Sequence, residues 1–236
     1  MFQSRDCQGA VFAEYATPGA HYKIEIRPPR IMADHTRLEV RKVAEADFPT
    51  EYGHFRIYGF EARKNGALEE AVALVMGDLL APAPPLVRIH SQCLTGDVFH
   101  SLRCDCRAQL ELSLEMIAAE GRGIVVYENE EGRGIGLLNK LRAYALQDAG
   151  ADTVEANEQL GFEVDLRQYE APAEVLRYLG VKSVRLLTNN PEKIAALEAC
   201  GVRVAARIPC QAESRGGQSE DYLRTKKERM GHILDL

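Results

Sequence analysis

Three cysteines that lie close together in the sequence could bind a metal ion. They are Cys93, Cys104 and Cys106, in the spacing C-x10-C-x-C. Three thiolates suit zinc and leave one of its four coordination positions open. Water in that position ionises near neutral pH, so zinc bound in this way could support hydrolysis. A fourth ligand from His90, His100 or a distant cysteine would instead make a closed structural site, and the spacing alone fits both interpretations.

A glycine-rich segment, EGRGIG at residues 131–136, follows an apolar run and precedes a helical pattern. It matches the dinucleotide-binding fingerprint G-x-G-x-x-G only loosely. Glycines let a ligand approach the backbone closely, and the start of a helix favours an anion. The carboxylate of Glu131 could accept hydrogen bonds from the N1–H and 2-amino groups of a guanine base. A tight turn with a solvated glutamate and arginine would explain the segment equally well.

A second candidate site for an anion is TNNPEK at residues 188–193, where a strand is expected to end and a helix to begin. Backbone N–H groups, the hydroxyl of Thr188 and the ammonium of Lys193 converge there, which suits phosphate. Pro191 stands where the first residue of a helix belongs, so a well-capped helix without a ligand is the alternative. Asp165 and Arg167, taken alone, are typical of a surface ion pair.

These candidate residues need a scaffold of strands and helices that alternate along the chain. Apolar runs predict strands at 22–27, 38–43, 54–60, 71–76, 86–90, 123–127, 184–187 and 202–205, and helical spacing predicts helices at 108–120, 137–149, 172–179, 192–199 and 222–234. This alternation indicates an α/β fold, and we expect a single-domain three-layer α/β/α sandwich with a mixed sheet. Residues 1–40 show little periodicity, so we expect an N-terminal extension that is partly ordered at most, followed by the main domain at 41–236.

The composition is that of a globular protein, with 236 residues, 46% hydrophobic and 27% charged, and a net charge of −6. The acidic balance argues against binding of a nucleic acid polymer, which needs a basic surface. No apolar run reaches the roughly 18 residues of a membrane span, and the N-terminus lacks the apolar core of a signal peptide. We therefore expect a cytoplasmic protein that binds no membrane. In that reducing compartment Cys7, Cys200 and Cys210 are expected to form no disulfide.

Several separate motifs, in one order, resemble the GTP cyclohydrolase II family. They are RIHSQCLTGD at 88–97, SLRCDC at 101–106, EGRGIGLLNK at 131–140, DTVEAN at 152–157, LGF at 160–162, LLTNNP at 186–191, and Lys226 with MGH at 230–232. The resemblance runs from about residue 41 to the C-terminus and makes 41–236 the catalytic domain. It implies that the chain opens the imidazole ring of GTP and releases formate and pyrophosphate. The product would be 2,5-diamino-6-(5-phosphoribosylamino)pyrimidin-4-one, made in the first step of riboflavin biosynthesis.

The resemblance also implies a role for individual residues. One Zn²⁺ per chain would be held by Cys93, Cys104 and Cys106, and water activated by it would attack C8 of the purine. The positions that would contact GTP are Arg88, Ile89, His90, Ser91, Gln92, Gln109, Glu131, Gly132, Arg133, Thr153, Thr188 and Lys193. Tyr144 would serve the ring opening. Arg167 matches an arginine proposed as nucleophile toward the α-phosphate, with Asp165 as its acid/base partner; a purely electrostatic clamp is the alternative. Mg²⁺ is expected on the triphosphate, and a homodimer is expected from the family.

The chain departs from the family's pattern at two places. Gln92 stands directly before Cys93 where the family usually has glutamate, and Asn129 and Glu130 stand where it usually has arginine and glutamine. Three acids at 128, 130 and 131 would repel a triphosphate if all of them faced it. Drift at rim positions explains this, and so does a specialised paralogue that stops at the formamidopyrimidine, serves a secondary pathway or accepts a different purine. A silent GTP-binding protein and a structural zinc module remain the alternatives from other classes.

Overall fold

The computed structural model describes residues 3–5, 11–17, 20–26, 38–64, 67–163, 165–212 and 218–235. The chain divides into two compact units, residues 1–37 and 38–236. The first contains β1 (Gln3–Arg5), β2 (Val11–Thr17) and β3 (Ala20–Ile26), which form an antiparallel sheet in the order β1-β2-β3. β3 covers most of the strand expected at 22–27. Cys7 lies outside the described residues, and the division into an extension and a catalytic domain stays a prediction.

A seven-stranded mixed sheet organises the second unit, in the order β10-β9-β7-β8-β6-β5-β4. Its strands are β4 (Glu39–Thr50), β5 (Gly53–Lys64), β6 (Ala67–Met76), β7 (Leu86–Ser91), β8 (Gly123–Glu128), β9 (Ser183–Leu187) and β10 (Arg203–Ile208). The strands β7 to β10 pair in parallel, and β4, β5 and β6 continue the sheet by antiparallel pairing. The predicted α/β class with a mixed sheet is therefore confirmed.

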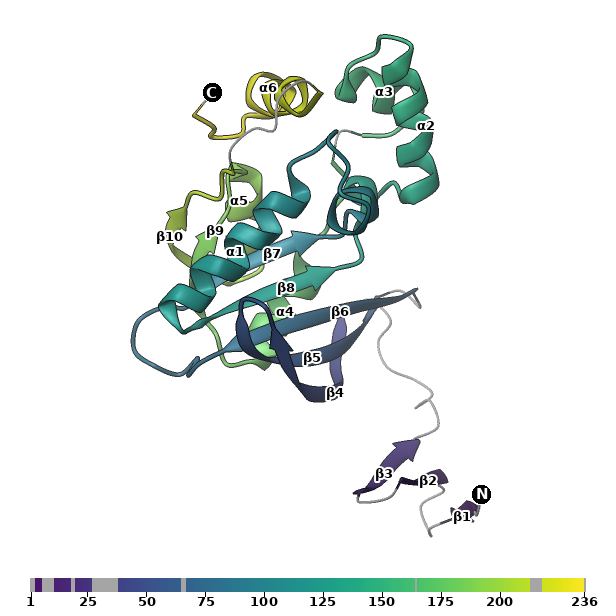
Figure 1. Cartoon of the computed structure of the whole chain (residues 1–236), viewed down its shortest axis with the longest axis vertical. Coiled ribbons are helices and arrows are strands. Elements are labelled where there is room, and N and C mark those ends of the chain that lie inside the picture. Colours follow the sequence, from purple (N-terminus) through teal and green to yellow (C-terminus); the bar gives the residue numbers. More distant parts are fainter. Residues whose placement is uncertain are drawn as a thin grey trace. The chain divides into compact units, whose positions relative to one another are not determined.

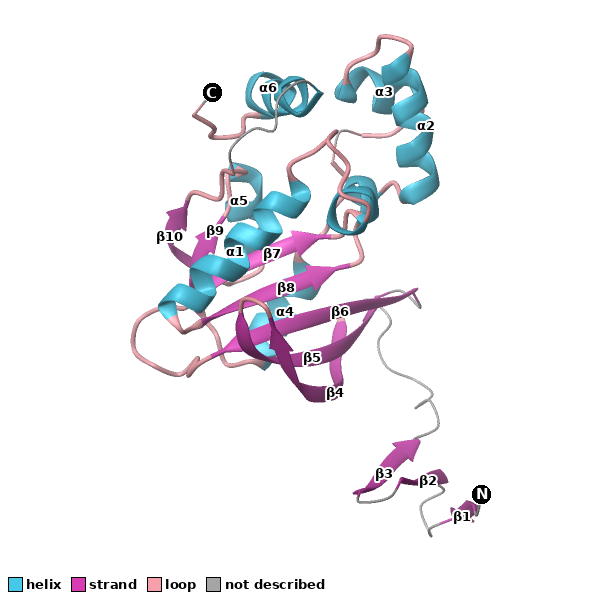
Figure 2. Cartoon of the chain, viewed as in Figure 1, coloured by secondary structure: helices cyan, strands magenta, loops and turns pink. Residues whose placement is uncertain are grey.

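Helices cover both faces of this sheet (Figures 1 and 2). The helices of this unit are α1 (Cys106–Glu120), α2 (Leu137–Asp148), α3 (Thr153–Gln159), α4 (Glu170–Tyr178), α5 (Pro191–Ala199) and α6 (Gln218–Met230). Side chains alternate along β7, so that Leu86 packs with Ile117 of α1 while its neighbour Val87 packs with Leu176 of α4 and Leu197 of α5. This alternation buries the sheet between α1 on one face and α4 with α5 on the other, which makes the three layers that the sequence predicts.

Two helices differ from the sequence prediction. α3 was not expected; it begins with a capping box in which the Asp152 side chain accepts from the backbone of Glu155 and the Glu155 side chain accepts from the backbone of Asp152. α6 ends at Met230 rather than near residue 234, because Gly231 has a left-handed φ of 64° that a helix cannot continue. Among the described residues, no helix has both the length and the apolar character that crossing a membrane requires.

The order of the parallel strands defines where a site can form. From β7 the chain passes through α1 to β8 on one side of β7, and later returns as β9 on the other side. In open sheets, the carboxyl ends of strands at such a reversal leave a crevice for ligands. The segments that follow β7, β8 and β9 carry the three groups of residues singled out in the sequence.

Candidate active site

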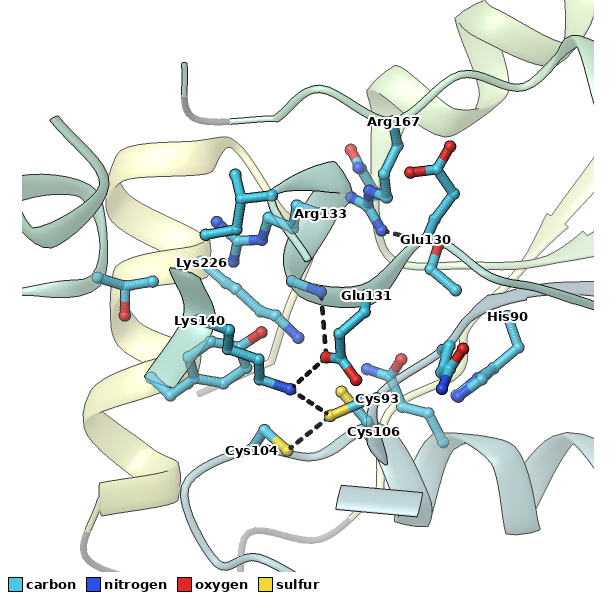
Figure 3. A pocket seen from close by; sticks show the side chains of 18 of the residues that line it. His90, Cys93, Cys104, Cys106, Glu130, Glu131, Arg133, Lys140, Arg167 and Lys226 are labelled. Atoms are coloured by element: carbon cyan, nitrogen blue, oxygen red, sulfur yellow. Dashed lines mark hydrogen bonds and ion pairs between the residues drawn. The ribbon is translucent and has the colours of Figure 1, made fainter. Parts of the chain in front are cut away.

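The three cysteines converge directly after β7 and at the start of α1 (Figure 3). Their sulfur atoms all lie within 4.8 Å of one another, and those of Cys93 and Cys104 are 3.7 Å apart. Tetrahedral zinc with bonds of about 2.3 Å would hold its sulfur ligands about 3.8 Å apart, so this donor set fits the metal. Neither His90 nor His100 joins the group, and within the described ranges no fourth protein ligand does. The arrangement is that of a site with an open coordination position.

The loop between the first two cysteines is shaped to bring the thiols together. Leu94–Val98 forms a single tight turn. A methyl group at Gly96 would lie 2.8 Å from the Cys104 sulfur and 3.1 Å from the Cys93 sulfur, so only glycine fits under the cluster. The carboxylate of Asp97 stabilises the turn, because it accepts hydrogen bonds from the backbone N–H of Cys93 at 3.0 Å and from the Tyr127 hydroxyl at 2.9 Å.

His90 supports the same turn. Its Nε2 lies 3.2 Å from both oxygens of Asp97, and its ring is 2% exposed. Burial lowers the pKa of His90, although Asp97 opposes the shift. The ring lines the cleft described below, but its observed partner is the turn that carries Cys93.

Lys140, from α2, connects the cysteines with the glycine-rich segment. Its Nζ donates to the Cys93 sulfur at 3.0 Å and to Oε1 of Glu131 at 2.7 Å. Hydrogen bonds from the other two thiols, and the charge of Lys140, hold the pKa of Cys93 well below its usual range. Hydrogen bonds with Cys104 and Cys93, together with burial, raise the pKa of Cys106. One thiolate is therefore stabilised by the chain alone, while three together need a cation.

The carboxylate of Glu131 is held by the chain itself. Oε2 accepts from the backbone N–H of Leu94 at 2.7 Å, and Oε1 accepts from that of Gly132 at 3.1 Å as well as from Lys140. Glu131 is 7% exposed. The Glu131 carboxylate thus already joins the loop that follows Cys93 to the glycine-rich turn. A guanine base would have to bind to its remaining lone pairs.

The turn at Glu131–Gly134 has an unusual backbone. Gly132 and Arg133 have φ values of 63° and 62°, in the left-handed region. Arginine adopts that conformation rarely, so the surrounding structure must stabilise it. The carbonyl of Arg133 accepts from the backbone N–H of Leu166 at 3.1 Å. This bond brings the segment of Asp165 and Arg167 to the side of the cleft opposite the thiols.

Asp165 and Arg167 are a close pair rather than a surface ion pair. Nε of Arg167 donates to Oδ1 of Asp165 at 2.9 Å, Nη2 donates to Oδ2, and Nη1 lies 3.3 Å from the Ser91 hydroxyl. The side chain of Arg167 is 12% exposed and that of Asp165 is 16% exposed. Burial alone would lower the pKa of Arg167, but Asp165 raises it above the ordinary value. Burial would likewise raise the pKa of Asp165, and Arg167 holds it below the ordinary value.

A buried wall of cations and amides is formed by Arg88 of β7, Gln109 of α1 and Lys193 of α5. Arg88 donates to the Leu187 carbonyl at 3.0 Å and to Oε1 of Gln109 at 2.6 Å. Lys193, near the start of α5, is 4% exposed and donates to the Ile89 carbonyl at 3.0 Å. Burial and the neighbouring arginines lower the pKa of Lys193 well below its ordinary value. The wall attracts anions and lies where the sequence placed a phosphate site.

These groups line one cleft. Among the residues predicted from the sequence, the cleft is lined by Arg88, His90, Ser91, Gln92, Cys93, Cys104, Cys106, Gln109, Glu131, Gly132, Arg133, Tyr144, Thr153, Arg167, Thr188 and Lys193. Ile89 and Asp165 are not among the lining residues. The Ile89 side chain lies in the core and only its carbonyl reaches Lys193, while Asp165 acts through Arg167.

Two predicted residues extend the site toward α2 and the β8 edge. The Tyr144 hydroxyl lies 3.2 Å from that of Thr95, and burial raises the pKa of Tyr144 to about 12. Gln92, half-buried, donates its backbone N–H to the Glu128 carbonyl. Glu130 also lines the cleft, while Asn129 is exposed. Two of the three departures from the family pattern, Gln92 and Glu130, therefore lie where a ligand would bind.

The cleft also contains residues to which the sequence assigned no role. They include Lys140, Asn157, Asn189, Tyr222, Lys226 and His232. Lys140 and Asn157 lie in motifs that carried the resemblance, as do Lys226 and His232 in the C-terminal motif. Membership of those motifs was the available signal, but it does not say what each side chain contacts.

Comparisons with known proteins identify the family to which most of the chain is similar. The family model described as GTP cyclohydrolase II matches residues 41–209. The riboflavin biosynthesis protein RibBA of Salinispora tropica is 56% identical over 200 residues, which cover 84% of this chain and 49% of that protein. GTP cyclohydrolase-2 of Escherichia coli is 52% identical over 198 residues, which cover 84% of this chain and 100% of that protein. The chain thus spans about half the length of RibBA and the whole of the E. coli enzyme.

Proposed function

This chain belongs to the GTP cyclohydrolase II family, and on that basis we propose that it hydrolyses GTP by opening the imidazole ring. The products would be formate, pyrophosphate and 2,5-diamino-6-(5-phosphoribosylamino)pyrimidin-4-one, in the first step of riboflavin biosynthesis. One observation carries the proposal: a three-sulfur metal-ligand cluster and a wall of buried cations face the same cleft. Hydrolysis of the ring needs the metal-ligand cluster, and recognition of the triphosphate needs the buried cations.

Zn²⁺ held by Cys93, Cys104 and Cys106 would supply a Lewis acid and an activated water to the cleft. The chain's own residues orient the substrate around it. Lys140 and Glu131 fix the cysteine loop against the glycine-rich turn, and the Tyr144 hydroxyl, beside Thr95, reaches the same corner of the cleft. With a pKa of about 12, Tyr144 is protonated at neutral pH and can donate a hydrogen bond or proton to the opening ring.

The phosphate end would be bound by Arg88, Lys193 and Arg167. We propose that Arg167 is an electrostatic clamp on the α-phosphate rather than a covalent nucleophile. A nucleophilic guanidine must first lose a proton, and Asp165 is the only carboxylate that an observed hydrogen bond joins to Arg167 among the described residues. The pair raises the pKa of Arg167 and lowers that of Asp165, which disfavours the transfer. A charged, planar guanidinium suits a phosphate without leaving its protonated form.

Further parts of the proposal rest on the family and on chemistry. Mg²⁺ would accompany the triphosphate, coordinated mainly by phosphate oxygens. We also propose a cytoplasmic homodimer, which sedimentation of the purified protein would test.

The deciding experiment incubates the zinc-loaded protein with GTP and follows formate, pyrophosphate and the nucleotide product by mass spectrometry. Release of formate and pyrophosphate together supports the proposal, and intact GTP contradicts it. Cys104→Ser should abolish formate release because it removes a metal ligand. Cys200→Ser, at the end of α5 and outside the cleft, is the matched control and should retain the activity.

A specialised paralogue is the second candidate, because Gln92 and Glu130 line the cleft and depart from the family's pattern. Such an enzyme would open the ring and retain the formyl group, so its product would be a formamidopyrimidine and no formate would appear. The same mass spectrum separates the two candidates.

A further inference from the structure

The C-terminal helix forms one wall of the cleft. α6 lies beyond residue 209, where the match to the family model ends. Tyr222 and Lys226 of α6, and His232 just after it, line the same cleft as the cysteines. In Figure 3, Lys226 reaches from α6 toward the space between Arg133 and the cysteines. The helix is therefore placed to contact whatever binds beside the metal ligands.

Three contacts fix this wall to the rest of the site. Lys226 Nζ donates to Oδ1 of Asp105 at 2.7 Å, and Asp105 stands between Cys104 and Cys106 in the sequence. Arg229 pairs with Asp152 at the start of α3. The backbone N–H of Ile233 donates to the Asn189 carbonyl, directly after β9, at 2.8 Å. The C-terminal segment is thus held to the loop that carries the cysteines, to the start of α3 and to the segment directly after β9.

Positive charge collects where α6 meets the glycine-rich turn. Lys226 Nζ lies 4.4 Å from the centroid of the Tyr222 ring, and the Arg133 guanidinium lies 6.0 Å from the same centroid. Asp105 balances Lys226, but no carboxylate pairs with Arg133 among the residues that the structure describes. Burial, followed by the charges of Lys226, Arg133 and Arg167, lowers the pKa of His232 to about 3.

Two buried nitrogen atoms in this region have no hydrogen-bond partner within the described part of the chain. They are Nη1 of Arg133 and Nε2 of His232. Leaving a buried polar group without a partner costs about 1–3 kcal/mol, so a native structure usually satisfies such a group with water or a ligand. Both atoms are buried, and Arg133 and His232 both line the cleft. Excess positive charge beside unsatisfied nitrogens suits an anion rich in acceptor oxygens.

We propose that Lys226 and His232, together with Arg133, bind the phosphate chain of the nucleotide, so that the C-terminal helix is part of the substrate site. The inference rests on the proposed function in identifying the anion as the triphosphate of GTP. Arg133 and Lys226 supply charge, and neutral His232 supplies a ring N–H. An uncharged nucleoside has no phosphate for Arg133, Lys226 and His232 to bind, so its affinity should not depend on them. That difference makes the inference testable.

The test measures the binding of three probes to the zinc-loaded protein by calorimetry: GTP, guanosine and inorganic tripolyphosphate. Lys226→Met and His232→Ala should each weaken GTP and tripolyphosphate about 10-fold or more, as expected for a lost charge-assisted contact of about 1.5–3 kcal/mol. Their affinity for guanosine should stay within a factor of about two. Lys227→Met is the matched control, because Lys227 is the exposed neighbour of Lys226 and lies outside the cleft.

Removing Lys226 leaves Asp105 buried without its partner, so Lys226→Met could disturb the cysteine loop. His232→Ala leaves the Asp105 pair intact and provides an independent answer, and the zinc content of each variant is measured alongside. The inference is overturned if His232→Ala leaves GTP affinity unchanged, if it weakens guanosine as much as GTP, or if the wild-type protein binds no tripolyphosphate. Failure of the proposed function would appear separately, as wild-type protein that binds tripolyphosphate through Lys226 and His232 but leaves GTP intact.

Discussion

The ammonium nitrogen of Lys140 lies 3.0 Å from the sulfur of Cys93, a residue 47 positions away in the chain. The same nitrogen lies 2.7 Å from Oε1 of Glu131. One cation therefore neutralises a thiolate that faces the metal position and a carboxylate that anchors the glycine-rich turn. Groups that hydrogen-bond to metal ligands in this way set the charge and the orientation of the ligands.

Replacing Lys140 with methionine should weaken zinc binding. The change keeps an unbranched side chain that is one atom shorter, and it leaves the Glu131 carboxylate and the Cys93 thiolate without a cation. Loss of such an outer contact typically costs about 10- to 100-fold in metal affinity, and we expect a loss in that range. Competition with a chromophoric chelator measures it directly. Arg142→Met, which removes an exposed cation from the next part of α2, should bind zinc like the wild type. Equal zinc affinity in both variants would contradict the role of Lys140.

Gly96→Ala should damage the metal site through sterics alone. The added methyl group would stand 2.8 Å from the Cys104 sulfur and 3.1 Å from that of Cys93, so the thiols must separate. Overpacking of this kind costs about 1–3 kcal/mol, equivalent to about 5- to 150-fold in zinc affinity if it falls on the metal-bound geometry. Gly59→Ala is the control, because a methyl group at Gly59 meets nothing within 4 Å. Zinc titration of the two variants should separate them, and a Gly96→Ala protein with wild-type affinity would contradict the argument.

Much of the scaffold could be predicted because local patterns determined it. The strands at β7, β8 and β9 are short apolar runs, and Gly121, Gly180 and Gly201 end α1 and follow α4 and α5 with left-handed backbones. The sequence does not predict α3, although Asp152 and Glu155 have the spacing of a capping box, because seven residues carry too little periodicity. The sequence predicts too late an end for α6 because the apolar pattern continues through Ile233 and Leu234, while the left-handed backbone of Gly231 ends the helix.

The site was predictable only as far as residue type and order reveal chemistry. Three cysteines in one short segment predict a metal site, and the structure brings their sulfur atoms together. Lys226 gave no comparable signal, because its partner Asp105 lies 121 positions away and only the folded chain joins them. Asp165 and Arg167 looked like a surface ion pair for the same reason, since their burial depends on the contact of Leu166 with Arg133.

Substitution of Arg167 distinguishes a clamp from a nucleophile. Lysine retains the positive charge at this position but not the planar guanidinium, whereas alanine removes both. If Arg167 acts as a clamp, Arg167→Lys should retain measurable pyrophosphate release, and Arg167→Ala should lose about 100-fold or more, as when an oriented charge is removed from a site of this kind. Formate release measured in the same samples reports on ring opening. Equal loss of pyrophosphate release in both variants would argue for a step that requires the guanidinium itself.

Glu130 should make the stability of the protein depend on pH. Burial, reinforced by Glu128 and Glu69, raises the pKa of Glu130 to about 7 from an ordinary value of 4.5. The folded protein therefore holds this proton more tightly than the unfolded chain does, and the free energy of unfolding falls as the pH rises from about 4.5 to about 7. Because Glu130 is only partly buried, we expect the effect to be about 1 kcal/mol after allowance for solvent screening.

Glu130→Gln removes that titration, so the variant should be about 1 kcal/mol more stable relative to the wild type at pH 8 than at pH 5. Urea unfolding of both proteins at the two pH values, at one fixed zinc concentration, measures the difference, and other titrating groups cancel in the comparison. Glu158→Gln, which changes an exposed carboxylate of α3, controls for the loss of an acid elsewhere. A stability difference between wild type and Glu130→Gln that stays constant from pH 5 to pH 8 would show that Glu130 is already ionised below this range, in which case its charge faces the cleft throughout.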